Sequence, residues 1–462
     1  MGVAQEFDLV VVGGGAAGLT AVTEARRRGA RTALVQDGPV GGECTFTGCV
    51  PSKALLAGAA RGESFAGAMA AVRATVARIA AGDEASMARA GVDVIRGRAT
   101  LASPTELHVA DRRLRTRRII LATGARPLVP PVEGLRDSDP LTNQTLFDLG
   151  ALPGRLAVLG GGAIGCEMAQ AFARLGSTVT VVEAEPRLLP REEPEASEVI
   201  TEALAADGAK VLTGEQLALV ERPGAGHAVR LHLAAGAVVD ADRVLVAVGR
   251  RAATDGLGLA EAGVTVDDEG YVRTDDALAT SAPGIWAAGD VTGRMPFTHA
   301  AARMALVAVH NALGGPRARL RPRRFDPAPI PWVTFTTPEV GRVGMTEAQA
   351  AGHGGQVAYL PLDAVDRAVT AAQTRGFVKL IAGPRRLLGN IAGGRILGAT
   401  VVAPTGGELV HEPALAMHTR MFTGRLAQAT HAYPSWSMAV QQAAAQFFLE
   451  LDGRTARPAR NG

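Results

Sequence analysis

Cysteine is scarce in this sequence: its 462 residues include only Cys44, Cys49 and Cys166. So few thiols cannot form the disulfide framework that stabilises small secreted proteins. Two of the three nevertheless stand five positions apart, within GGECTFTGCVPSK at residues 41–53. A close cysteine pair in a reducing compartment is more often catalytic than structural. We therefore interpret Cys44 and Cys49 as candidate catalytic residues, and Cys166, inside an apolar helix, as part of the core.

Long apolar runs are also absent. No stretch of about 18 uninterrupted apolar residues occurs, and the N-terminus shows no basic-then-apolar leader, so the sequence predicts neither a membrane span nor secretion. We expect a cytoplasmic protein. Aromatic residues make up only 4% of the chain, but 47% of it is hydrophobic and 56 residues are glycine. This composition is typical of a globular protein of about two to four domains.

A strong excess of charge of either sign is absent as well. The formal net charge is +3, and the arginines are scattered between acidic residues. Lysine is rare, because Lys53, Lys210 and Lys379 are the only ones. Since nucleic-acid binding depends on clustered basic charge, we expect a solvated surface with neither nucleic acid nor a membrane as partner. The expected partner is a small molecule.

What the sequence does contain is a repeated glycine-rich turn. Residues 7–36 and 156–183 each read as a buried strand, a G-x-G-x-x-G turn, a helix and a second strand. A helix that starts at such a turn can hold a pyrophosphate with its free amide groups. One turn of this kind also serves plain packing, but two copies in matching context predict two dinucleotide sites in an α/β fold with parallel sheets. The glycines are Gly13, Gly15 and Gly18 in the first copy, and Gly160, Gly162 and Gly165 in the second.

The residue that closes each copy differs in charge. Glu183 ends the second strand of the second copy, where a carboxylate accepts hydrogen bonds from ribose hydroxyls and repels a 2′-phosphate. We therefore expect NADH at the second site, with NADPH possible because Arg187 is close. The matching residue of the first copy is Gln36, an uncharged acceptor. A plain surface carboxylate at a strand end is the alternative interpretation of Glu183.

The spacing of the two cysteines constrains the backbone between them. Five residues of regular helix span about 7.5 Å, more than the roughly 4.4–6.8 Å between the Cα atoms of a disulfide. The segment must therefore be a distorted turn if the two bond, and Gly42 and Gly48 permit one. A helix is predicted to start at Pro51, which places Cys49 just before a helix N-terminus that stabilises a thiolate. No metal site is expected, because two thiols alone do not complete a tetrahedral set. Two buried free thiols are the alternative.

The stretch GGECTFTGCVPSK resembles the active-site segment of the class I pyridine nucleotide–disulfide oxidoreductases, the family of dihydrolipoamide dehydrogenase, glutathione reductase and mercuric reductase. ILATGARP at residues 120–127 and TSAPGIWAAGDVTG at residues 280–293 are similar to its FAD-binding motifs. VTFTTPEVGRVGMTEAQA and GELVHEPALAM resemble its dimerisation domain. The resemblance covers essentially the whole chain.

The resemblance implies an α/β fold with two Rossmann-like dinucleotide-binding domains and a C-terminal α+β dimerisation domain. The implied order is an FAD-binding domain at 1–145, an NAD(P)-binding domain at 146–270, a second part of the FAD-binding domain at 271–327 and the dimerisation domain at 328–462. It also implies a homodimer in which the partner subunit completes each active site.

Roles for the candidate residues follow from the same resemblance. Cys49 would lie against the flavin as a thiolate, and Cys44 would exchange with the substrate. Lys53 would approach the flavin and pair with Glu167. Electrons would pass from nicotinamide to flavin and on to a Cys44–Cys49 disulfide. The resemblance places Gly13, Gly15, Gly18, Gln36, Gly42, Lys53, Ala99, Thr123, Gly124, Asp290 and Thr298 at FAD, and Gly160, Gly162, Gly165, Glu183 and Gly249 at NAD.

Near the C-terminus the sequence departs from the family pattern. The family's stretch resembling H-x-H-P-T-x-x-E uses its second His, oriented by the Glu, as acid and base, whereas HAYPSWSM has Tyr433 and Met438 there. Reference pKa values of about 10 for Tyr and about 6.5 for His leave roughly one tyrosine in a thousand ionised at neutral pH. Tyr433 is thus predicted to be a poor general base, and losing such a base forfeits about 10²–10⁴ in rate. His431 is the alternative, although the alternation of an extended segment turns it to the other side.

The same stretch indicates one branch of the family. Pro434, Ser437 and Met438 repeat a run that resembles mercuric reductases, in which a thiol-bound metal ion needs electrons more than a proton relay. The C-terminal cysteine pair of those enzymes is missing. We therefore predict an FAD-dependent NAD(P)H oxidoreductase that reduces a disulfide, a thiol-bound metal or another small acceptor through Cys44 and Cys49. The alternatives are a slow redox-sensing flavoprotein and a dihydrolipoamide dehydrogenase with an altered acid–base residue.

Overall fold

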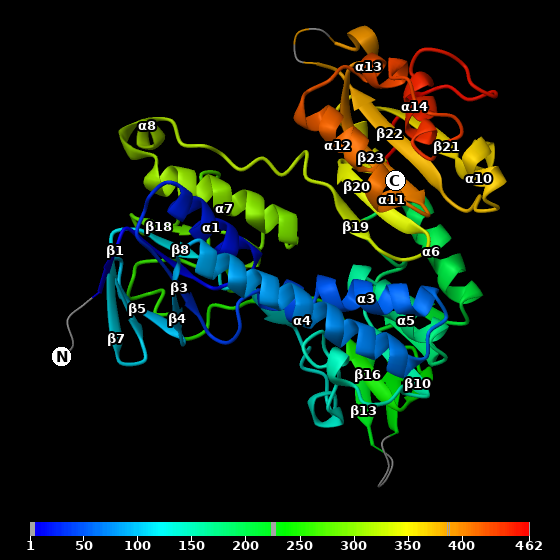
Figure 1. Cartoon of the computed structure of the whole chain (residues 1–462). Helices are drawn as coiled ribbons and strands as arrows, with labels where there is room; N and C mark the ends of the chain where they lie inside the picture. Colours follow the sequence, from blue (N-terminus) through cyan, green and yellow to red (C-terminus); the bar gives the residue numbers. More distant parts are fainter. Residues whose placement is uncertain (1–4, 223–227, 386, 388, 462) are drawn as a thin grey trace.

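The computed structural model of the chain describes residues 5–222, 228–385, 387 and 389–461 (Figure 1). The first four residues, part of the stretch inspected for a leader, lie outside this description. In the described residues, two parallel sheets and one antiparallel sheet form the framework, together with three further sheets. Among the described residues, no helix combines the length and the apolar character that crossing a bilayer requires.

The first parallel sheet has the strand order β18-β8-β2-β3-β4. Its central strand β2 is completely buried, as the unbroken apolar run LVVV of a two-sided parallel strand requires. Helices α1 and α7 pack on each other against this sheet, so segments far apart in the sequence lie side by side (Figure 1). The bounds are β2 Leu9–Val12, β3 Thr32–Gln36, β4 Asp93–Arg96, β8 Ile119–Leu121, β18 Ile285–Ala287, α1 Ala16–Arg27 and α7 Thr298–Leu313.

The second parallel sheet has the order β12-β11-β10-β16 and repeats the strand, glycine turn and helix of the first. Its helix α5 is buried on all sides, because every residue from Gly165 to Phe172 is buried. Helix α3 contacts α5, so the segment that contains the cysteine pair packs directly on the second unit. The bounds are β10 Arg155–Leu159, β11 Thr178–Glu183, β12 Lys210–Thr213, β16 Arg243–Val246, α5 Ala163–Arg174 and α6 Pro194–Ala206.

The C-terminal part is a six-stranded antiparallel sheet of order β19-β20-β23-β22-β21-β24 with helices on it. Strand β22 is buried along its whole length because it lies in the interior of this sheet. The bounds are β19 Trp332–Thr334, β20 Glu339–Gly344, β21 Gln356–Pro361, β22 Phe377–Gly383, β23 Arg395–Ala403, β24 Arg457–Pro458, α9 Glu347–Ala351, α10 Asp366–Thr370, α11 Gly406–Leu409, α12 His411–His418, α13 Thr423–Gln428 and α14 Met438–Ala445.

The remaining elements surround the two parallel sheets. The three further sheets have the orders β1-β7-β6-β5, β13-β14-β15 and β17-β9. Their strands are β1 Gln5–Phe7, β5 Ala99–Ser103, β6 Glu106–Val109, β7 Arg112–Thr116, β9 Ala125–Pro127, β13 Leu217–Glu221, β14 Val229–Leu233, β15 Val238–Ala241 and β17 Arg250–Ala252. The other helices are α2 Gly42–Phe46, α3 Cys49–Ala60, α4 Phe65–Arg89 and α8 Gly315–Leu320.

This architecture confirms the predicted fold class, an α/β fold with two Rossmann-like units and a C-terminal α+β unit. Strands β8 and β18 are neighbours in the first sheet although the whole second unit lies between them in the sequence. The chain therefore leaves the first unit, builds the second and returns. The exact boundaries expected at residues 145, 270 and 327 stay predictions.

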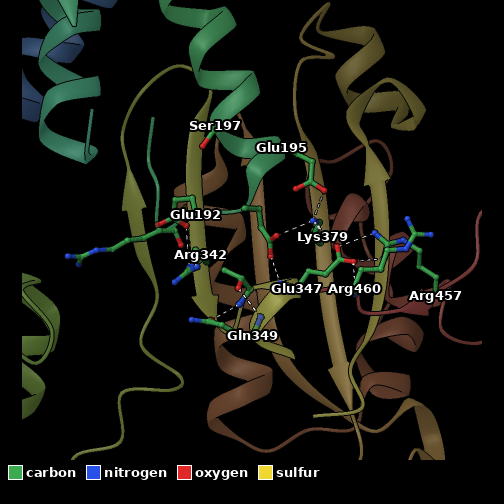
Figure 2. A network of polar contacts seen from close by, with 12 residues as sticks. Glu192, Glu195, Ser197, Arg342, Glu347, Gln349, Lys379, Arg457 and Arg460 are labelled. Carbon is green, nitrogen blue, oxygen red and sulfur yellow. Dashed lines mark hydrogen bonds and ion pairs between the residues drawn. The ribbon is translucent and has the colours of Figure 1, made fainter. Parts of the chain in front are cut away.

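Buried ion pairs join the start of α6 to the C-terminal sheet (Figure 2). Lys379 on β22 is 1% exposed. Its Nζ lies 3.1 Å from both Glu193 Oε2 and Glu347 Oε2, and 2.6 Å from Glu195 Oε1. Arg457 of β24 pairs with Glu347 in turn. Buried charges are tolerated where each has a partner of opposite sign, so this network fixes how the second unit packs on the C-terminal sheet.

Replacing Lys379 by Met should destabilise the protein by about 3–5 kcal/mol, because it leaves three carboxylates without their shared cation. Urea unfolding followed by circular dichroism measures the effect. The matched control is Lys210→Met on β12, an exposed lysine whose loss should change stability by less than about 0.5 kcal/mol. Equal unfolding midpoints for the two variants would contradict a stabilising role for the network.

Candidate active site

The two candidate cysteines lie on either side of a break between two helices. Cys44 is in α2, and Cys49 is the first residue of α3. Gly48 between them has φ −126° and ψ −115°, far from helical values. The helix start predicted at Pro51 is therefore wrong by two residues, because a proline in the first turn sacrifices no helical hydrogen bond. Cys49 consequently lies inside the first turn and not before it.

A single hydroxyl contacts both sulfurs. Thr298 Oγ1 lies 3.2 Å from Cys44 Sγ and 3.4 Å from Cys49 Sγ, within hydrogen-bonding reach of both. Thr298 is the first residue of α7. The packing of α7 on α1 brings this residue to the two sulfurs. Both cysteines are free thiols in this structure. The sequence indicated Thr298 only as a flavin neighbour, and its contact with the sulfurs was missed because no local pattern encodes it.

The two thiols differ in their electrostatic character. A hydrogen bond from Cys44 lowers the pKa of Cys49 to about 5, against the effect of burial and with further help from the Thr298 hydroxyl and the Lys53 ammonium. The same contact, together with burial, raises the pKa of Cys44 above its usual range. Cys49 is therefore the thiolate at neutral pH and Cys44 the protonated partner. Burial, together with the negative charges of Glu167 and Glu183, raises the pKa of the third thiol, Cys166, which is fully enclosed in the core.

The ion pair between Lys53 and Glu167 is present in the structure. Lys53 Nζ lies 2.8 Å from Glu167 Oε2 and 4.5 Å from the centre of the Phe335 ring. Glu167 is 3% exposed, and its second oxygen accepts a hydrogen bond from the Phe335 N–H at 2.9 Å. Burial raises the pKa of Glu167, while Lys53 opposes the rise. The pair joins α3, α5 and the C-terminal domain next to Cys49.

The first glycine-rich turn forms a cradle against the segment that contains the cysteines. Gly15 is the N-cap residue of α1, whose N-terminus has no side-chain cap. Gly42, with φ +65°, approaches so closely that an added Cβ would lie 2.5 Å from Gly15 Cα. A Cβ on Gly18 would lie 1.8 Å from Gly13 O, so the third glycine permits close packing. Free amide groups at a helix start fit a pyrophosphate.

Other residues expected at FAD stand at the same edge of the first sheet. Thr123 and Gly124 follow β8, and Asp290 follows β18, so they lie at carboxyl ends of parallel strands, where α/β sheets bind ligands. Thr123 Oγ1 is buried and has no hydrogen-bond partner within the described part of the chain. Burial raises the pKa of Asp290. The Ala99 side chain is buried in the core, so only its backbone can reach a cofactor.

The sequence pattern missed a second charged contact beside Cys44. Glu43 forms an ion pair with Arg250 of β17 and accepts a hydrogen bond from Gln144 Nε2 at 3.0 Å. Arg250 Nε also lies 3.6 Å from Asp290 Oδ2. The guanidinium thus connects the segment that contains the cysteines with the edge of the first sheet. In the sequence, the only signal for Glu43 was its position next to Cys44 in GGEC, and this position does not identify Arg250 as its partner.

The second glycine-rich turn repeats the geometry of the first. Gly162 is the N-cap residue of α5, and an added Cβ there would meet no atom within 4 Å. A Cβ on Gly165 would lie 1.9 Å from Gly160 O, matching the close packing in the first copy. Gly249 follows β16 with φ +149°. This open helix start also fits a pyrophosphate.

The two copies share one further hydrogen bond. The Gly14 N–H donates to Gln36 Oε1, and the Gly161 N–H donates to Glu183 Oε2. Gln36 and Glu183 therefore occupy equivalent places at the ends of β3 and β11. Only the second of these places is charged.

The residues expected to act as acid and base lie in the C-terminal domain. Tyr433 is 70% exposed, and its hydroxyl donates to Asp366 Oδ2 at 3.0 Å, which raises the Tyr433 pKa. The His431 ring nitrogens lie 2.9 Å from Ala429 O and from Glu412 Oε1. Among the described residues, no hydrogen bond links Tyr433 or His431 to either cysteine.

Comparison with known proteins gives a consistent result. The pyridine nucleotide-disulphide oxidoreductase family matches residues 7–305, and its dimerisation domain matches residues 330–444. Mercuric reductase of Streptomyces lividans is 37% identical over 96% of this chain and 97% of its own, and dihydrolipoyl dehydrogenase of Thermus scotoductus is 34% identical over 95% and 97%. The structure of the HOCl-induced flavoprotein disulfide reductase RclA from Escherichia coli superposes with a TM-score of 0.86 at 30% identity, over 95% of this chain and 99% of that one.

Replacing Thr298 by Val should raise the pKa of Cys49 by about one pH unit, because a hydrogen bond to a charged group contributes about 1.5 kcal/mol. In the original protein the pKa of Cys49 is lowered to about 5, so its thiolate is present above that pH. When the pKa is higher, less thiolate is present between about pH 5 and neutrality, so alkylation should be reduced most in this range. Iodoacetamide labelling of the reduced protein, resolved by peptide mass spectrometry, measures this. Thr201→Val on α6 is the control, and an unchanged profile in Thr298→Val would contradict the role of the hydroxyl.

Proposed function

Because the chain belongs to the pyridine nucleotide-disulphide oxidoreductase family, we propose that it transfers electrons from NADH to a small acceptor through Cys44 and Cys49. Proteins of this family are FAD-dependent and use NAD(P)H as electron donor. The proposal depends on one observation, the contact of both sulfurs with Thr298. This contact keeps two thiols of unequal pKa together beside a cradle that fits a dinucleotide.

The first cradle would hold the FAD and the second the nicotinamide cofactor. When bound, the flavin supplies two-electron transfer between the nicotinamide and the sulfur pair. Lys53 and Glu167 would stay paired, with opposite charges that balance, beside the cysteines during this electron transfer. The residues assigned to FAD are Gly13, Gly15, Gly42, Gln36, Thr123, Gly124 and Asp290, and those assigned to the nicotinamide cofactor are Gly160, Gly162, Glu183 and Gly249.

The nature of the acceptor follows from the proton on Cys44. To reduce a disulfide, Cys44 must lose that proton and bond to one acceptor sulfur, while the other acceptor sulfur takes up a proton and leaves as a thiol. The Cys49 thiolate then bonds to Cys44 and releases the first acceptor sulfur as a thiolate, which takes a proton from the solvent. Tyr433 is a poor acceptor for the proton, since its hydroxyl already donates to Asp366. A soft metal ion displaces the proton by binding to the sulfur and needs no such base. We therefore favour a thiol-bound soft metal ion as substrate.

Anaerobic titration with NADH tests the electron path. The original protein, with Cys44 and Cys49 first oxidised to a disulfide, should consume about twice as much NADH as the Cys44→Ser variant before unused NADH accumulates, because the disulfide takes up two electrons in addition to those of the cofactor. A panel of disulfides, quinones and mercuric–thiol complexes then identifies the acceptor. Equal NADH consumption in both proteins would contradict electron transfer to the sulfurs.

A second candidate function is a redox-sensing flavoprotein that turns over slowly, and the hydrogen bond that occupies the Tyr433 hydroxyl favours it. Both functions predict reduction of the sulfur pair by NADH. They differ in the acceptor panel: rapid turnover with a metal–thiol complex supports the enzyme, while reduction of the sulfurs without turnover on any acceptor supports the sensor. In either case we propose a homodimer, formed through the domain that matches residues 330–444, in which Tyr433 reaches the active site of the partner subunit.

The preference for NADH rests on Glu183 and on the position of Arg187. The Glu183 carboxylate accepts from the N–H groups of Gly161 and Glu185 at the end of β11. The Arg187 guanidinium donates to the carbonyl groups of Pro190 and Glu192 and is occupied by this loop. A carboxylate without a free arginine beside it disfavours the 2′-phosphate of NADPH.

Replacing Glu183 by Ala should lower the ratio of kcat/KM for NADH over NADPH roughly tenfold, because a charge-assisted hydrogen bond contributes about 1.5 kcal/mol. Steady-state kinetics with both cofactors gives this ratio. Glu185→Ala, which removes an exposed carboxylate two residues away, is the matched control and should leave it unchanged. A similar change in both variants would mean that general charge and not the Glu183 position selects the cofactor.

A further inference from the structure

Stacked aromatic rings lie at the start of α7, directly before the residue that contacts the two thiols. Phe297 is the N-cap residue of α7, and its ring stacks on Trp332, with the centres 5.8 Å apart and the planes inclined by 12°. The His299 ring also stacks on the Phe297 ring, with the centres 5.9 Å apart and the planes inclined by 17°. Trp332 belongs to β19 of the C-terminal domain. Rings from two domains therefore meet at the helix start.

A buried ion pair also contacts Trp332. The Arg342 guanidinium lies 4.3 Å from the centre of a Trp332 ring, and the indole N–H donates to Glu192 Oε1 at 2.8 Å. Arg342 Nε is 3.2 Å from Glu192 Oε2, and the side chains of the two are only 9% and 8% exposed. Figure 2 shows this pair beside the Lys379 network, at the start of α6. A cation over an aromatic face and a paired carboxylate fix the plane of the indole.

In the sequence, Thr298 lies between Phe297 and His299, the two residues at the start of α7 that stack on each other. The α7 N-terminus lacks a side-chain cap, and the first helical hydrogen bond runs from the Ala301 N–H to the Phe297 carbonyl at 2.8 Å. Phe297 is held by Trp332, and His299 Nε2 lies within hydrogen-bonding distance of Pro331 O, next to Trp332 in sequence. Consecutive Cα atoms are about 3.8 Å apart, so the position of Thr298 follows from that of its two neighbours.

We propose that Trp332 and Phe297 are positioning residues that hold Thr298 Oγ1 between the sulfurs of Cys44 and Cys49. The proposal rests on the proposed function, in which these sulfurs are the reacting atoms. The two Oγ1–Sγ distances of 3.2 and 3.4 Å leave little room for displacement. Hydrogen bonds weaken steeply with distance and angle, so a shift of about 1 Å at the helix start would remove one or both contacts.

The test measures the pKa of Cys49 in the reduced holoenzyme, through the pH dependence of its alkylation by iodoacetamide. Trp332→Leu removes the stack and should raise this pKa by about one pH unit, as Thr298→Val does. Trp332→Phe keeps a ring against Phe297 but loses the indole N–H, and should leave the pKa near its original value. The other groups whose charge acts on Cys49, namely Cys44, Lys53, Glu167 and Asp290, are unchanged in all variants.

A double variant separates positioning from general loosening. If Trp332 acts through Thr298, Trp332→Leu combined with Thr298→Val should shift the pKa no further than Thr298→Val alone. Additive shifts, an unchanged pKa in Trp332→Leu, or a full shift in Trp332→Phe would each overturn the proposal. Phe297→Leu provides the same test from the other ring if Trp332→Leu does not fold. Alkylation requires no turnover, so a failure of the proposed acceptor chemistry would appear in the acceptor panel and leave this result intact.

Discussion

The break between α2 and α3 is the constraint on which the site depends. In a continuous helix, Cys44 and Cys49 would be about 7.5 Å apart along the axis and could not share a neighbour so closely. The non-helical backbone of Gly48 lets both sulfurs reach one hydroxyl, that of Thr298. The new helix then begins at Cys49, where free amide groups favour a negative sulfur. The approach of both sulfurs to one hydroxyl and the stabilisation of the Cys49 thiolate thus both depend on the turn at Gly48.

Buried charges mark the places where the units of the chain meet. Lys53 and Glu167 join the segment that contains the cysteines to the second unit, and Arg342 and Glu192 join the second unit to the C-terminal sheet. Lys379 binds three carboxylates at the same junction. An unpaired buried charge is costly, so each pair disfavours separation of the surfaces that contain its two members. A site assembled from three units needs such fixed junctions, because its atoms must stay within tenths of an ångström.

Sequence patterns predicted the parts of the site that are local. The two glycine turns, their helices and the equivalent Gln36 and Glu183 are each encoded within about thirty residues, where strand, turn and helix signals are read directly. The family resemblance also implied the Lys53–Glu167 pair, which the structure contains. The helix start at Pro51 was predicted wrongly, because proline is accepted anywhere in the first turn and does not mark its first residue.

By itself, the sequence determined the fold class, the two dinucleotide cradles and the presence of two neighbouring cysteines, since these depend on composition and short-range spacing. The position of Cys49 at a helix start also indicated it as the thiolate, and only the tertiary structure decided which side chains surround the two sulfurs. Thr298 lies 249 residues from Cys49, Arg250 lies 207 residues from Glu43, and Trp332 lies 140 residues from Glu192. Such contacts arise when separate hydrophobic cores pack together, and no periodicity along the chain records which side chains that packing brings within reach.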